Sequence, residues 1–268
     1  MRYKIDHDYH IHTNLSPCSR CPEQMPDRIF QYAEEMGFSS ICVTDHFWDS
    51  DVPNVPYDYR NLNQELLSTL KPLPQSDKIK FLFGCEAEIN SKMQIGISPK
   101  NCDLFDLVII PTTHLHMHGI SVDENDVKTL EQRAEQWIKR FDLVLNSSLP
   151  FHKVGIAHLV CHLMAPRPYK SEDVIEILSL IPDSEMERLF KKAAELGIGI
   201  EINSDDMKFK DEDTDAFMRP FRIAKKCGCK FYMGSDAHSP ANFSGVIDRF
   251  NRAVDILGLE ESDKFLLK

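Results

Sequence analysis

The stretch Asp8-Tyr9-His10-Ile11-His12-Thr13 places two imidazoles two residues apart inside a predicted strand that covers residues 4–12. Side chains alternate between the two faces of a strand, so His10 and His12 are expected to project to the same side. Asp236 and His238 repeat this spacing in the segment Ser235-Asp236-Ala237-His238. Imidazole together with carboxylate suits zinc, manganese or iron. The two pairs therefore indicate a metal site that joins both ends of the chain.

A second pattern recurs along the sequence: short hydrophobic runs end in, or are followed by, a side chain of a metal-binding type. His46 follows the run 41–45, Glu86 follows the run 81–85, and His114 and His158 end two more runs. A parallel α/β barrel collects the carboxyl ends of its strands at one rim. The predicted ligands, which this arrangement would bring together, are His10, His12, His46, Glu86, His114, His158, Asp236 and His238.

Strands and helices are predicted to alternate along the whole chain. The predicted strands are residues 4–12, 39–45, 80–89, 106–113, 154–160, 199–203 and 231–235. The predicted helices are about 22–36, 60–71, 124–147, 171–180, 184–196, 213–227 and 240–257. This alternation predicts an α/β barrel or a doubly wound sheet. The barrel is favoured, because the chemistry is spread over nearly every strand end and no G-x-G-x-x-G turn is present.

Two further features refine this prediction. No linker divides the chain, so residues 1–268 are expected to form a single domain, with the proline-rich stretch 53–74 as a long loop. Pro22 and Gly37 are expected to bound the first helix, in the usual order of proline at the start and glycine at the end. In the third helix an apolar stripe faces inward, and Arg133 and Arg140 are expected on the solvated face.

Composition limits the classes of partner. Lys and Arg number 31 against 42 Asp and Glu, giving a net charge of −11, whereas nucleic-acid binders usually carry a basic face. A small anion held by metals is therefore a better expectation than a long polyanion. The sequence has no apolar run near 18 residues and no signal-peptide core, so we expect a cytoplasmic protein that does not enter the membrane.

The eight cysteines are expected to be reduced, because cytosolic thiols rarely form disulfides. A structural zinc site made by Cys18-x-x-Cys21 and Cys227-x-Cys229 is disfavoured, since a four-cysteine site usually pairs two tight C-x-x-C turns.

Taken in order, these segments resemble the PHP (polymerase and histidinol phosphatase) superfamily. The resemblance rests on Asp8-Tyr9-His10-Ile11-His12-Thr13, Thr44-Asp45-His46, Gly84-Cys85-Glu86-Ala87, His114, His158 and Gly234-Ser235-Asp236-Ala237-His238. It implies a distorted seven-stranded (β/α)7 barrel, two or three divalent metal ions (Zn, Mn or Fe) and phosphoester hydrolysis. The overall length is similar to that of stand-alone, histidinol-phosphatase-like members.

The resemblance also implies how the ligands divide. His10, His12, Glu86 and Asp236 would surround one metal. Glu86 would bridge to a second metal held by His114 and His158, and His46 and His238 would hold a third. Many relatives carry a further His or Asp ligand five or six positions after the second histidine, where this chain has Pro17 and Cys18. Cys18 could bind as a thiolate, or it could simply pack in the loop.

Several neighbours of these positions remain open. His116 is the alternative to His114, and His162 the less favoured alternative to His158, because His114 and His158 directly end their strands. Asp8 and Asp45 are expected either to orient imidazoles or to serve ordinary polar packing. Glu201 and Asn203 lie on a strand expected to face the same rim.

The expected reaction is attack on phosphorus by a hydroxide that the metals hold, so no serine or cysteine nucleophile is needed. Arg167, in the loop after the His158 strand, is the candidate phosphate clamp, because a guanidinium pairs bidentately with phosphate oxygens; a solvated surface arginine is the alternative. The leading hypothesis is a phosphomonoesterase that acts on a small substrate, and histidinol phosphate is one candidate. A nuclease or nucleotide phosphoesterase is the second hypothesis, and a non-catalytic metal-binding module is the third.

Overall fold

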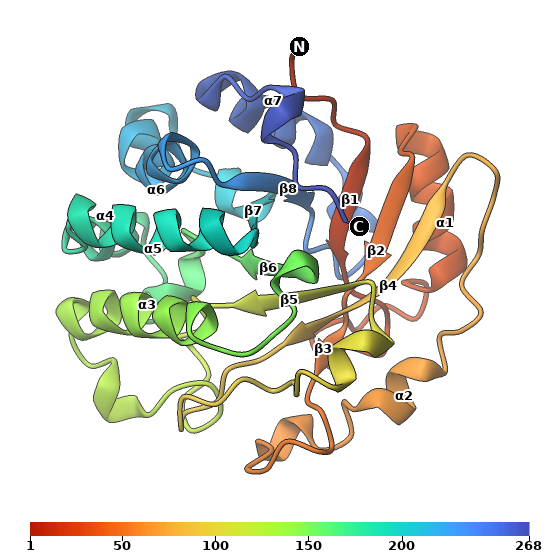
Figure 1. Cartoon of the computed structure of the whole chain (residues 1–268), viewed down its shortest axis with the longest axis horizontal. Helices are drawn as coiled ribbons and strands as arrows, with labels where there is room; N and C mark the ends of the chain where they lie inside the picture. Colours follow the sequence, from red (N-terminus) through yellow and green to blue (C-terminus); the bar gives the residue numbers. More distant parts are fainter. Residues whose placement is uncertain (268) are drawn as a thin grey trace.

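The computed structural model describes residues 1–267, in which parallel strands form a nearly closed barrel (Figure 1). The strands are β1 (His7–Ile11), β2 (Ser40–Val43), β3 (His46–Phe47), β4 (Lys80–Ala87), β5 (Leu107–Pro111), β6 (Val154–Ala157), β7 (Gly199–Asn203) and β8 (Lys230–Gly234). They lie in the order β1-β2-β4-β5-β6-β7-β8, with β3 paired to β4. After a two-residue break, β3 continues in the direction of β2 and also pairs with β4, so the two count as one barrel strand. The barrel therefore has seven strands, and the predicted distorted seven-stranded barrel is confirmed.

The barrel closes between its first and last strands. The amide of Asp236 donates to the carbonyl of His10 at 2.7 Å, and the amide of His12 donates to the carbonyl of Ala237 at 3.0 Å. Backbone hydrogen bonds of this kind hold neighbouring strands at a fixed spacing. The seam of the barrel therefore runs through both ligand pairs that the sequence singled out.

The helices cover the outside of the strands (Figure 1). They are α1 (Pro26–Met36), α2 (Gln64–Ser68), α3 (Leu130–Leu145), α4 (Ser171–Ser179), α5 (Asp183–Leu196), α6 (Thr214–Lys226) and α7 (Val246–Leu257). All seven predicted helices occur, but α1, α2, α3 and α7 begin four to six residues later than predicted. Residues 22–25 are outside α1, α2 is a short piece of 60–71, and residues 124–126 and 240–243 form 3-10 turns ahead of α3 and α7.

Local capping explains these boundaries. Pro26, not Pro22, occupies the first turn of α1, and Gly37 ends that helix with a left-handed φ of 70°. α3 begins at a capping box, in which the Thr129 side chain accepts from the Gln132 amide and the Gln132 side chain accepts from the Thr129 amide. This box satisfies two amides that would otherwise lack partners, so the helix starts there.

An irregularity in β1 aims its side chains. The register of β1 against β2 shifts between Asp8 and Ile11. Tyr9 packs inside the barrel near Tyr232, with ring centroids 6.5 Å apart, and His10 also points inward. Two consecutive side chains thus face the interior, which a regular strand with its period of two does not allow.

The interior of the barrel below the metal-type residues is apolar. A buried cluster of side chains from the strands and the C-terminal segment fills it, namely Cys42, Leu82, Leu107, Ile109, Ala157, Tyr232 and Phe265. Phe265 joins the barrel through its amide, which donates to the carbonyl of Phe231 at 2.8 Å. A separate, larger core lies mainly between strands and helices. The rim residues therefore stand on a packed base rather than above a pore.

The stripe prediction for α3 is wrong for its two arginines. Arg140 is fully buried and Arg133 almost so. Arg140 donates to the carbonyls of Thr112 and Ser121 at 2.9 and 2.7 Å, and Arg133 donates to the carbonyl of Met164 at 2.8 Å. A guanidinium has five donors, so it can be buried where irregular loops present several carbonyls.

None of the helices described within residues 1–267 combines the length and the hydropathy that a membrane-spanning helix needs.

The C-terminal segment is expected to stabilise the barrel from below. Phe265→Ala would remove a buried ring and lower the free energy of unfolding by about 3–5 kcal/mol. Leu266→Ala is the matched control, because Leu266 is 68% exposed, and its effect should stay within about 0.5 kcal/mol. Urea unfolding followed by circular dichroism measures both changes. Equal stability of the two variants would refute this role of Phe265.

Candidate metal centre

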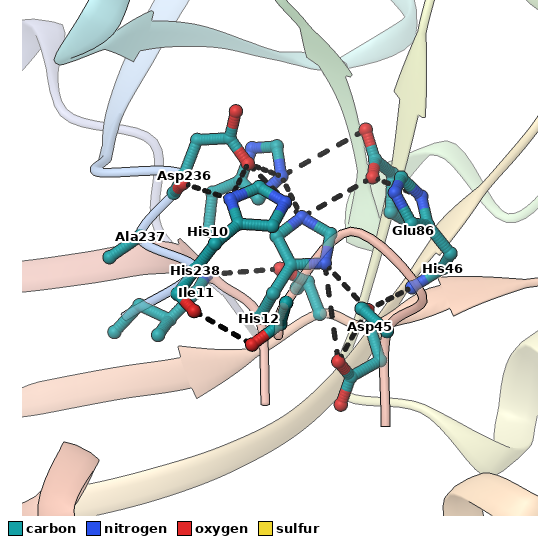
Figure 2. A network of polar contacts seen from close by, with 12 residues as sticks. His10, Ile11, His12, Asp45, His46, Glu86, Asp236, Ala237 and His238 are labelled. Atoms are coloured by element: carbon teal, nitrogen blue, oxygen red, sulfur yellow. Dashed lines mark hydrogen bonds and ion pairs between the residues drawn. The ribbon is translucent and has the colours of Figure 1, made fainter. Parts of the chain in front are cut away.

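The predicted ligands meet at the carboxyl ends of the strands, as Figure 2 shows for the six that it labels, namely His10, His12, His46, Glu86, Asp236 and His238. The strands β1, β3 and β4 and the segments after β5, β6 and β8 each contribute to the group, which comprises His10, His12, His46, Glu86, His114, His158, Asp236 and His238. Residues as distant in sequence as 10 and 238 thus lie around one small volume.

Glu86 lies at the centre of the group. One of its oxygens is 2.7 Å from Nδ1 of His46 and 3.4 Å from Nε2 of His12. Its other oxygen is 3.8 Å from Nε2 of His114 and 3.9 Å from Nε2 of His10. β3 delivers His46 to this position, because its parallel pairing with β4 sets His46 directly opposite Glu86.

Asp236 is the second acid of the group. Its Oδ1 lies 3.1 Å from Nε2 of His12 and 3.3 Å from Nε2 of His10, and its Oδ2 lies 3.6 Å from Nε2 of His158. Asp236 and His158 both have left-handed backbones, with φ of 54° and 56°. Non-glycine residues rarely adopt this conformation, and strain of this kind collects at functional sites.

The residues fit divalent cations, because their lone pairs converge without donors to satisfy them. Neither oxygen of Glu86, which is 1% exposed, accepts a hydrogen bond from the described residues. Buried polar groups are normally paired, so an unpaired buried carboxylate points to a cation. Ligand atoms gather within 4.8 Å of one another in the groups His10–His12–Glu86 and Glu86–His114–His158.

The two acids and His12 have the protonation states that metal binding requires, whereas Glu86 and Glu201 outweigh burial and raise the pKa of His46 and His10, so these two rings must lose a proton when a metal binds. Burial alone would raise the pKa of Glu86, but His46 and His10 beside it hold that pKa well below its usual value. Asp236 behaves in the same way, since His10 and His238 outweigh its burial and lower its pKa. Burial and the neighbouring His238 lower the pKa of His12 well below its usual value. Anionic carboxylates beside a neutral imidazole are the states in which these groups bind metals.

Acids and a hydroxyl behind the imidazoles set their orientation. Glu201 lies 2.6 Å from Nδ1 of His10, and its other oxygen accepts from the amide of His158 at 2.9 Å. The Oγ of Ser16 lies 2.8 Å from Nδ1 of His12. Contacts at Nδ1 leave Nε2 free to face a metal. Gly234 makes room for this arrangement, because a Cβ there would collide with Glu201 and with His10.

Glu88 is a supporting residue that the sequence reasoning missed. It lies 2.8 Å from Nδ1 of His114 and accepts from the buried guanidinium of Arg140 at 3.1 Å. Its position two residues after Glu86 was the available signal, because the alternation of β4, continued one residue past its end at Ala87, puts both side chains on the same side. Helix α3 is thereby connected to the orientation of a candidate ligand.

The residues left open in the sequence fall into two classes. Asp45 accepts from Thr13 and, at 2.6 Å, from Ser16, so it supports His12 through that hydroxyl. Asp8 has no hydrogen bond to an imidazole among residues 1–267; it accepts from the amides of His10 and Ser235 and fixes the backbone at the barrel seam. Asn203 accepts from the Asp205 amide, whereas Glu201 holds His10 directly.

Of the alternative histidines, neither belongs to a compact group of ligand atoms among residues 1–267. His114 approaches Glu86, whereas His116 lies further out. Burial, with His114 and Arg167 nearby, lowers the pKa of His116 to about 3, so it is neutral. His162 packs its ring against Tyr169, with centroids 5.1 Å apart.

The centre opens into a cavity of about 150 Å³. Its lining comprises Cys18, His46, Glu86, His114, His116, Met117, Leu163, Asp236 and His238. Cys18 lies within reach of His46 and His238, which outweigh its burial and lower the pKa of its thiol to about 7. Arg167 lines an adjoining cavity of about 290 Å³ that shares His116 with the first.

All eight cysteines are free thiols. The disfavoured four-cysteine zinc site does not form among residues 1–267, because the thiols of Cys227 and Cys229 contact the carbonyls of Glu187 and Phe190. Cys18 instead lies among histidines.

Glu201→Gln is expected to weaken metal binding. A single amide oxygen cannot accept from both the His10 ring and the His158 amide, so zinc affinity should fall about 10–100-fold. Calorimetric zinc titration of chelator-treated protein measures the change. Glu195→Gln, at an exposed position of α5, is the control and should bind zinc as the wild type does. Unchanged affinity in Glu201→Gln would contradict the orienting role.

Comparisons with known proteins agree with this geometry. The family model of the PHP domain matches residues 8–204. A histidinol phosphate phosphatase from Lactococcus lactis, solved with zinc, L-histidinol and phosphate, is 20% identical with a TM-score of 0.63, over 98% of this chain and 99% of that one. A candidate histidinol phosphatase from Listeria monocytogenes is 13% identical with a TM-score of 0.54, over 89% and 97%. No curated protein sequence matches the chain. The chain belongs to the PHP domain family.

Proposed function

We propose that this protein hydrolyses a small phosphomonoester, with two or three divalent ions (Zn, Mn or Fe) held by the eight predicted ligands. The observation that carries the proposal is the convergence of imidazoles on two acids, Glu86 and Asp236, at a cavity of about 150 Å³. A cavity of this size accommodates a phosphoryl group, and its acids require cations before an anion can enter.

The contacts suggest how the ligands divide. His10, His12, Glu86 and Asp236 would hold one ion. Glu86 would bridge to a second ion with His114 and His158, and His46 and His238 would serve a third. Divalent ions bound there would lower the pKa of water and neutralise charge on the phosphoryl oxygens.

The chain itself supplies orientation and exclusion of water. Glu201, Ser16 and Glu88 contact the Nδ1 atoms of His10, His12 and His114, so these three rings direct Nε2 at the centre. A preorganised polar site avoids the cost of reorienting dipoles during reaction. Leu163 and Met117 line the mouth and limit access of water to the bound phosphate.

Arg167 is proposed to clamp the phosphate or the adjoining part of the substrate. Its Nε donates to the hydroxyl of Tyr169 at 3.0 Å, which restrains the side chain beside the second cavity. That cavity adjoins the metal centre at His116, so one substrate can span both. With Arg133 also in the lining, this region carries positive charge in a chain whose net charge is −11.

Histidinol phosphate is the first substrate to test, because the Lactococcus lactis relative was solved with L-histidinol and phosphate. The small cavity and the acidic chain favour a small substrate over a nucleic acid. Turnover of histidinol phosphate, a panel of nucleotides and a short oligonucleotide should be compared. Preference for the oligonucleotide would favour the nuclease alternative, and full metal content without turnover of any ester would favour the non-catalytic module.

His12→Ala and Asp236→Ala test the proposed function. Each substitution removes a ligand. Because bound metal ions lower the activation barrier by several kcal/mol, the rate of p-nitrophenyl phosphate hydrolysis should fall at least about 100-fold. Metal content, measured by plasma mass spectrometry, should fall in the same variants. Wild-type metal content and activity in both variants would end the proposal.

Arg167→Ala tests the clamp. Loss of a charge-assisted contact worth about 1.5–3 kcal/mol should raise KM about tenfold or more. Arg222→Ala, which alters an exposed pair with Asp215, is the control and should leave KM unchanged. Steady-state kinetics on the best phosphomonoester measures both. An unchanged KM in Arg167→Ala would remove this residue from the site.

A further inference from the structure

Cys18 lies in a short loop after β1 that is fixed on both sides of the thiol. Before it, Ser16 donates to Asp45 at 2.6 Å and lies 2.8 Å from Nδ1 of His12. After it, Ser19 donates to the carbonyl of His238 at 2.7 Å. These hydrogen bonds hold the loop in place, so the sulfur of Cys18 is positioned at the candidate metal centre before any ion binds.

The sulfur belongs to a compact group of ligand atoms. One ligand atom from each of Cys18, His12, His46 and His238 lies within 4.8 Å of the others. The rings of His12 and His238 stack with centroids 4.2 Å apart, and His46 is 4.7 Å from His12. Independently, the buried Glu86 without hydrogen-bond donors lines the same cavity as Cys18, His46 and His238.

The donor types divide the centre into two regions. The groups His10–His12–Glu86 and Glu86–His114–His158 offer only nitrogen and oxygen, whereas the group at Cys18 offers nitrogen and sulfur. A further buried group, His158–Cys161–Asp206, also contains a thiol but shares no residue with the group at Cys18. Thiolate selects soft or borderline ions such as zinc, and carboxylate with imidazole also accepts manganese. Nε2 of His12 is already assigned to the ion held with His10, Glu86 and Asp236. The ligands left for an ion beside the sulfur are therefore Cys18, His46 and His238.

We propose that Cys18, His46 and His238 form a nitrogen–sulfur metal site that selects zinc-like ions and remains distinct from the nitrogen–oxygen sites beside it. The inference rests on the proposed function, because it concerns one part of the same metal centre. Three protein ligands leave a coordination position open, as in catalytic zinc sites. Because Cys18 is exposed at the rim, the bound ion would also shield its thiol from alkylation.

Cobalt substitution gives the direct test, since Co²⁺ bound to thiolate shows a sulfur-to-metal charge-transfer absorption that nitrogen and oxygen ligands lack. Chelator-treated whole protein is loaded with Co²⁺, and its spectrum and cobalt content are measured. The wild type should show the band, and Cys18→Ser should lose it together with about one cobalt per chain. Cys21→Ser is the matched control, because Cys21 lies in the same loop but in no ligand group, and it should retain both.

Alkylation by iodoacetamide gives a second readout within one molecule. Zinc should slow modification of Cys18 at least about tenfold and leave Cys21 unaffected, as peptide mass spectrometry can quantify. Cys18→Asp should retain metal there, lose the sulfur band and bind zinc over manganese with lower preference than the wild type.

The failure of this inference is distinguishable from failure of the proposed function. Cobalt-loaded wild type without the sulfur band, or zinc-independent alkylation of Cys18, would overturn the site. If Cys18→Ser then kept full phosphatase activity, the proposed function would stand on the nitrogen–oxygen sites alone. A wild type that binds neither cobalt nor zinc would overturn both.

Discussion

The rim of this barrel depends on the burial of one ionised carboxylate, Glu86, among imidazoles. An unpaired buried charge is among the most costly features that a fold can contain. Four histidine nitrogens within 3.9 Å offset part of that cost, but none donates a hydrogen bond to Glu86 with good geometry. Divalent cations would supply the missing compensation. Stability of the rim and affinity for metal are therefore expected to be two aspects of one interaction.

The fold converts this constraint into a specific arrangement. The backbone hydrogen bonds of Asp236 and His12 close the barrel between its first and last strands. These residues are also candidate metal ligands, so the seam of the barrel forms part of the candidate metal centre. The register shift in β1 turns His10 inward beside Tyr9, and left-handed backbone at His158 and Asp236 turns those side chains toward the same point. Such distortions lower the regularity of the barrel where the site requires it. The packed base below, which includes Phe265, provides the rigid support.

The barrel and the residues at its rim could be predicted from the sequence, because both follow from the pattern of apolar and polar residues along the chain. Apolar runs mark strands, and a polar residue at each run's end marks the rim, so His46, Glu86 and His158 could be found without a structure. Orientation could not be found in this way. The burial of Arg140 and its contact with Glu88 depend on loops that bring carbonyls to a helix, and helical periodicity assigns that arginine to solvent. The helix starts were likewise misjudged where 3-10 turns precede α3 and α7.

A shared cluster of cations around Glu86 is the feature on which the other assignments depend. Anomalous diffraction at the zinc edge, from crystals grown with zinc and phosphate, tests it most directly. At least two anomalous peaks are expected, each about 2.0–2.2 Å from imidazole nitrogens or carboxylate oxygens of the rim and one of them bonded to Glu86. Crystals in which these side chains keep the arrangement of Figure 2 but hold no anomalous peak among them would contradict it.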